Sequence, residues 1–115
     1  MPTQELVVAY EQARGRHAAA TRELTDLLAR MALATLADAL PGATTVEAVG
    51  EYNADWIPTL RIQRVLGRDG AVLFDVEVGH ADRGVEDAVD QVNTEYLDTL
   101  IDLTGDAHMG PVIIG

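Results

Sequence analysis

The sequence predicts an α+β fold in the order α-β-β-β-α, in which a long N-terminal helix and a C-terminal helix pack on a three-stranded antiparallel meander. Three observations predict it: a helical apolar repeat over residues 3–40, strand-like segments separated by turn residues between 44 and 78, and a second helical repeat over residues 83–103. At 115 residues the chain is expected to form a single α+β domain, 1-115.

The first predicted helix, residues 3–40, carries apolar and small side chains at alternating steps of four and three, which is the spacing of an amphipathic helix. These residues are Leu6, Tyr10, Ala13, His17, Ala20, Leu24, Leu27, Met31 and Ala34. Thr3 is the expected N-cap, and Pro41-Gly42 is expected to end the helix. A second apolar set, Leu28, Ala32, Leu36 and Leu40, is expected to lie on the sheet.

The length of this helix raises the question of a partner. At 1.5 Å per residue an unbroken helix would be about 54 Å long, which exceeds a compact domain of this size. Either the helix breaks near Gly15, or its overhang packs on a second subunit. Because the stripe continues in phase across Gly15, the second alternative is favoured, and a homodimer is predicted.

The middle of the chain predicts strands. Residues 44–52 alternate in polarity, with Val46 and Ala48 on one face. Residues 60–78 predict a hairpin with the three-residue loop Arg68-Asp69-Gly70 and a left-handed Gly70. The predicted register pairs Leu66 with Val72, Arg64 with Phe74, Ile62 with Val76, Leu60 with Val78 and Arg61 with Glu77. This register makes Arg64 the one charged residue on the apolar face of the hairpin.

The last predicted helix, residues 83–103, begins after Asp82 as the N-cap and ends at Gly105. Its predicted apolar stripe is Val85, Val89, Val92, Tyr96, Leu100 and Leu103. The apolar tail at residues 111–114 predicts a possible extra C-terminal edge strand.

The charge is unevenly distributed. The formal net charge is −11; residues 1–68 hold eight acids and seven arginines, whereas residues 69–115 hold eleven acids and only Arg83. Such a surface repels phosphate backbones, so no nucleic-acid binding is expected, but it would attract a basic protein. The predicted partner-binding residues are Glu86, Asp87, Asp90, Glu95 and Asp98. The alternative is that the acidity serves only solubility or adaptation to salt.

Composition excludes several function classes. The chain contains neither cysteine nor serine, which excludes disulfides, thiolate metal sites and the common nucleophilic triads, so no catalytic residue is predicted. No apolar run approaches the roughly 20 residues that span a bilayer, and the first residues do not resemble a secretion signal. A cytoplasmic protein with no membrane association and no cofactor is therefore expected.

One candidate metal site is visible in the sequence. Asp75 and Glu77 share one face of a predicted strand, and His80 follows, so carboxylates and an imidazole could hold a divalent cation. The alternative is a solvated sheet face.

No motif identifies a family. The sequence favours a non-catalytic acidic protein-binding module, of the adaptor, chaperone or immunity type, acting as a homodimer; the alternative is a small metal-dependent enzyme using this carboxylate-histidine site.

Overall fold

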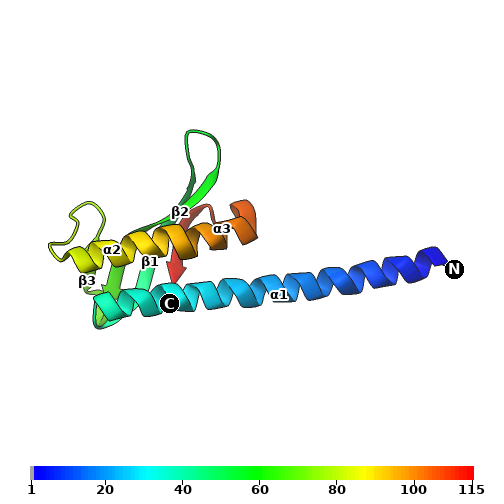
Figure 1. Ribbon diagram of the computed structural model, residues 1–115, viewed down its shortest axis with the longest axis horizontal. Helices are drawn as coiled ribbons and strands as arrows, with labels where there is room; N and C mark the ends of the chain where they lie inside the picture. Colours follow the sequence, from blue (N-terminus) through cyan, green and yellow to red (C-terminus); the bar gives the residue numbers. More distant parts are fainter. Residues whose placement is uncertain (1) are drawn as a thin grey trace.

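The computed structural model describes residues 2–115 and confirms the α+β fold (Figure 1). In chain order its elements are α1 (Pro2–Ala39), β1 (Ala43–Tyr52), β2 (Pro58–Gly67), η1 (Arg68–Gly70), β3 (Val72–Asp75), α2 (Arg83–Gln91), η2 (Val92–Leu97), α3 (Asp98–Thr104), η3 (Gly105–His108) and β4 (Gly110–Ile114). The four strands form one antiparallel sheet in the order β3-β2-β1-β4. The C-terminal tail is thus the fourth strand, at the sheet edge where it was predicted.

The core lies between the sheet and the helices. The C-terminal half of α1 packs with the continuous segment α2-η2-α3, and both contact the sheet. The largest fully buried side chains come from α1, β1, β2 and η2: Leu36, Leu60, Ile62, Leu97, Val46, Val65 and Val92. In β1 the predicted alternation is confirmed, because Val46, Ala48 and Gly50 are buried while their neighbours are not.

The predicted hairpin loop is correct, but the predicted register is wrong beyond its first pair. Leu66 does pair with Val72, and Gly70 has the expected positive φ of 75°. A bulge at Leu73 then pairs Val65 with Phe74 and Arg64 with Asp75, which turns the Phe74 ring into the core. The remaining predicted pairs do not form because β3 ends at Asp75.

A second bulge changes the predicted position of Arg64. Glu47 pairs with Arg64 while Ala48 pairs with Ile62, so Gln63 is the extra residue on β2. The bulge places Arg64 on the face of the sheet that the helices leave open, not on the apolar face. The charge is therefore solvated, and no buried partner is needed.

The last helical segment begins and ends as predicted. Asp82 Oδ1 accepts a hydrogen bond from the Gly84 N–H at 2.8 Å, and Gly105 ends α3 with a φ of 63°. Between them, η2 is a π-helical turn, which holds one residue more than an α-helical turn. The core-facing stripe accordingly steps from Val92 to the buried Leu97, not to the predicted Tyr96, which is only half-buried.

The molecule is elongated because α1 extends beyond everything else. Its principal extents are 66 × 32 × 22 Å, and its radius of gyration is 17.6 Å, compared with about 13 Å for a compact chain of 100 residues. Figure 1 shows the other elements gathered around the C-terminal half of α1, while its N-terminal half runs free. Within residues 2–115, no helix combines the length and the apolar character that crossing a membrane requires.

Candidate interaction surfaces

The most extensive uncovered surface belongs to α1. Every residue from 3 to 20 is exposed, so no part of the described chain packs on this half of the helix. The stripe predicted from the sequence stays exposed along the whole helix. Its large members are Leu6 (70% exposed), Tyr10 (61%), Leu24 (48%), Leu27 (43%) and Met31 (46%). We call the nine residues of this repeat, from Leu6 to Ala34, the outer stripe.

The outer stripe is separate from the face of α1 that builds the core. Ala32, Leu36 and Leu40 are buried against the body, whereas Leu27 and Met31, in the same turns, remain almost half exposed. The C-terminal half of α1 is therefore apolar on two faces, only one of which the body covers. Steps of four and three average 3.5 residues, the repeat with which one helix packs along another.

The five acids predicted to bind a partner, Glu86, Asp87, Asp90, Glu95 and Asp98, do not share one role. We call them the acidic face. Glu86 Oε1 accepts a hydrogen bond from the His80 N–H at 2.7 Å, so this carboxylate supports the loop before α2. Asp98 Oδ1 forms an ion pair with Arg61 Nη1 at 2.6 Å. Both are partly buried by these contacts.

The other three carboxylates of the acidic face point outward. Asp87, Asp90 and Glu95 are exposed, and none of them forms an ion pair with the described residues 2–115. Glu95 Oε2 accepts a hydrogen bond from Gln91 Nε2 at 3.3 Å. These three charges are the part of the predicted partner-binding set that is available to another molecule.

Sequence reasoning missed the contact that fixes this helical segment to the sheet. Because β3 ends at Asp75, the outer edge of β2 has no neighbouring strand at Ile62. There the Asn93 Oδ1 in η2 accepts the Ile62 backbone N–H at 3.0 Å. Arg61 reaches across the same edge to Asp98. An asparagine in mid-helix carries no sequence signal for this role, which depends on the π-helical turn.

The candidate metal residues extend from the end of β3 into the loop before α2, and two of them hold the backbone there. Asp75 Oδ1 accepts the Glu77 N–H at 2.9 Å, and His80 Nδ1 accepts the Asp82 N–H at 3.0 Å. Across residues 2–115, no three side chains of metal-ligand type come together closely enough to hold an ion. A metal site at Asp75, Glu77 and His80 stays a prediction from the sequence.

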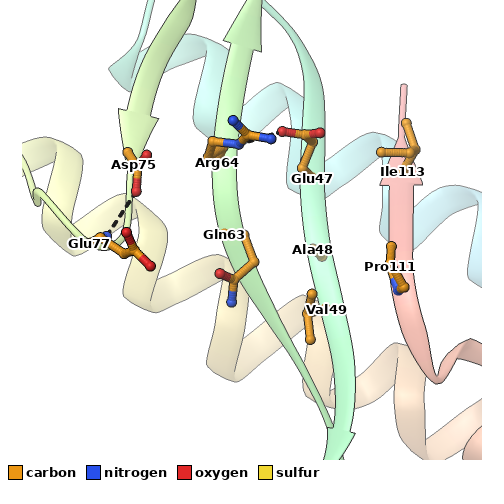
Figure 2. A pocket seen from close by; sticks show the side chains of 9 residues that line it. All are labelled: Glu47, Ala48, Val49, Gln63, Arg64, Asp75, Glu77, Pro111 and Ile113. Atoms are coloured by element: carbon orange, nitrogen blue, oxygen red, sulfur yellow. Dashed lines mark hydrogen bonds and ion pairs between the residues drawn. The ribbon is translucent and has the colours of Figure 1, made fainter.

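The open face of the sheet is hollowed above β1 and β2 (Figure 2). The hollow has a volume of about 380 Å³, and Glu47, Arg64, Asp75, Pro111 and Ile113 are among its lining residues. Arg64 Nε lies 2.7 Å from Glu47 Oε1, so its guanidinium neutralises a partly buried carboxylate. Arg64 and Glu47 thus pair with each other across β1 and β2.

The hairpin between β1 and β2 forms a projecting tip (Figure 1). Trp56 is 81% exposed there and has a positive φ of 61°. Asn53 Oδ1 fixes the tip by accepting the N–H groups of Asp55 and Ile57 at 2.8 and 3.0 Å. At its base the Tyr52 hydroxyl donates to Asp106 Oδ2 at 3.1 Å, and this hydrogen bond raises the pKa of Tyr52.

Comparisons with known proteins add no further evidence: no family model matches the chain, and neither the curated proteins nor the solved structures contain a significant match.

Proposed function

We propose that this chain is a non-catalytic, cytoplasmic protein-binding module of the adaptor, chaperone or immunity type, and that it acts as a homodimer through the outer stripe. The observation that carries the proposal is the exposure of that stripe over four heptads of α1. From Leu6 to Ala34 it is about 42 Å long at 1.5 Å per residue. Covering it takes a helix of similar length, and α1 is the one helix of that length in residues 2–115.

The acidic face supplies the second surface of the proposed module. Asp87, Asp90 and Glu95 are exposed on α2 and η2, and Asp87 borders a groove that Thr35 and Asp38 of α1 also line. Neither Thr35 nor Asp38 belongs to the outer stripe, so dimerisation through that stripe does not require burial of these three carboxylates. Exposed carboxylates that form no ion pair within residues 2–115 favour a partner with a basic surface, and attraction to it weakens as salt rises.

Self-association tests the dimer. Burying the exposed half of each large side chain of the outer stripe contributes about 1 kcal/mol per side chain. Leu24→Glu removes that contribution in both subunits and brings a carboxylate into the interface. We expect a loss of about 3 kcal/mol per dimer, or roughly a hundredfold in the dissociation constant, measured by sedimentation equilibrium.

Val8→Glu is the matched control for Leu24→Glu. Val8 is also exposed on α1, at 56%, but lies outside the outer stripe. Both variants add one charge and remove one apolar side chain, so a general effect of charge on α1 would appear in both. If the parent protein is a monomer at high concentration, or if the two variants dissociate equally, the proposed dimer is wrong.

Partner binding is tested separately by affinity capture at low and at high salt. The double variant Asp87→Arg/Asp90→Arg should lose a stoichiometric basic partner that the parent protein retains at low salt. Glu51→Arg/Asp55→Arg makes the same change of charge on the distant hairpin and should retain that partner. Equal retention by both variants would show that the acidic face is not the binding surface.

A further inference from the structure

We infer that the two α1 helices pair antiparallel, in one register that sets Leu24 of each subunit against Ala13 of the other. This inference rests on the homodimer proposed above and goes beyond it by fixing the orientation and the contacts of the two chains. It follows from the order of large and small residues along the outer stripe and from the charges beside it.

Side-chain size favours the antiparallel arrangement. The large residues lie at the two ends of the outer stripe, Leu6 and Tyr10 in its first half and Leu24, Leu27 and Met31 in its second, with Ala13 and Ala20 between them. Antiparallel helices bring the two halves together. The layers of the inferred register join Leu6 with Met31, Tyr10 with Leu27, Ala13 with Leu24 and His17 with Ala20, each pair occurring twice by symmetry. None of these layers consists of two alanines, so each of them contains at least one larger side chain.

A parallel pair would bring each residue against its own copy. Three layers would then contain only alanine, at positions 13, 20 and 34, and two histidines would meet at position 17. Alanine layers leave space between the helices, and empty space in an interface forfeits packing.

Charges beside the outer stripe select the register. In an antiparallel pair, the residue immediately before each of the stripe positions 10, 17, 24 and 31 flanks the interface on one side. These flanking residues of one subunit face those of the other subunit. The inferred register brings Arg16 of one subunit near Glu23 of the other, twice by symmetry. A shift of one heptad in one direction would bring Glu23 against its own copy and Arg16 against Arg30. A shift in the other direction would bring Arg16 against its own copy.

The structure leaves these groups available. In residues 2–115, the ion pairs on α1 are Arg14 with Glu11 at 4.0 Å and Arg30 with Asp26 at 2.9 Å, so Arg16 and Glu23 have no counter-charge within the chain. Both residues are exposed. Figure 1 shows nothing lying alongside α1 at the level of residues 6–20, where the second helix would run.

Disulfide trapping tests the orientation, and the absence of native cysteine makes each bridge unambiguous. The variants are Leu6→Cys, Met31→Cys and the double variant, each oxidised and run on a non-reducing gel. Antiparallel pairing places the two copies of position 6 about 37 Å apart, at 1.5 Å per residue, far beyond disulfide reach. We expect covalent dimers from the double variant alone. Covalent dimers from each single variant would overturn the inference in favour of parallel helices.

Charge reversal tests the register. Glu23→Arg should weaken self-association about tenfold, because two attractive pairs become repulsive, and Arg16→Glu/Glu23→Arg should restore it. Arg22→Glu is the control, because Arg22 lies on the far side of α1 from the outer stripe, and it should change nothing. Failure of the double variant to restore the affinity would overturn this register. If the parent protein does not self-associate, the proposed dimer fails before its orientation is in question.

Discussion

Asn93 gives the sharpest test of how the acidic helical segment is held on the sheet. The perturbation is Asn93→Ala, which removes the oxygen that accepts the Ile62 N–H at 3.0 Å. Ile62 is 1% exposed, so water cannot replace the lost acceptor. A buried donor left without a partner costs about 1–3 kcal/mol. We therefore expect a loss of about 2 kcal/mol, which lowers the unfolding temperature of a chain of this size by about 8 °C.

The assay is thermal unfolding by circular dichroism, with native-state hydrogen exchange of the Ile62 amide. Chain concentration is held constant, since self-association would raise the apparent stability. Asn93→Asp keeps an acceptor oxygen in place and should retain the protection of Ile62. Thr94→Ala alters an exposed neighbour that bonds only within its own helix, and should change stability by less than about 0.5 kcal/mol.

If Asn93→Ala unfolds within 1 °C of the parent protein and the Ile62 amide exchanges no faster, the amide of Asn93 does not stabilise the edge of β2. The attachment of α2-η2-α3 would then rest on apolar contacts such as those of Val92 and Leu97.

Three further predictions follow from local geometry. Gly50→Ala should destabilise the chain by about 2 kcal/mol or more in urea unfolding, because a Cβ there collides with the His108 carbonyl oxygen. Gly15→Ala has open space and should stabilise the helix locally by about 0.5–1 kcal/mol, which should raise the helix content measured by circular dichroism. The hydrogen bond to Asp106 raises the pKa of Tyr52 above 10.0. The stability that this bond contributes is therefore complete below pH 10 and is lost as the pH rises through the raised pKa. Asp106→Asn should lower that pKa in an absorbance titration, and an unchanged titration would contradict the contact. Trp56, the one tryptophan of the chain, should be quenched by acrylamide as fully in the folded protein as in urea.

Repeating patterns in the sequence predicted the helices and strands. Which face some side chains occupy could not be predicted, because single inserted residues in the folded chain change it. The steps of four and three predicted α1, and Asp82 and Gly105 marked the ends of the last helical segment. The bulge at Leu73 and the π-helical turn at Val92–Leu97 each insert one residue, and each moves the following residues to another face. Composition does not reveal such insertions, because packing in the folded chain decides them.

The same limit applies to the candidate surfaces. The outer stripe was visible in the sequence because it depends only on local periodicity, and the structure shows it exposed on one unbroken helix. The acids of the last helical segment looked equivalent in the sequence. Their roles differ because two of them form contacts with other segments. Glu86 accepts a hydrogen bond from the His80 backbone in the preceding loop, and Asp98 pairs with Arg61, which is distant in the chain.

The free half of α1 has a consequence for how this protein folds. Residues 3–20 gain nothing from packing on the body, Gly15 lowers their helical propensity by about 1 kcal/mol relative to alanine, and a lone helix of this length is only marginally stable in water. The order of this segment should therefore depend on whether something lies against it. Dilution of a self-associating chain would unwind the segment while the body stays folded, so that helix content becomes a measure of chain concentration.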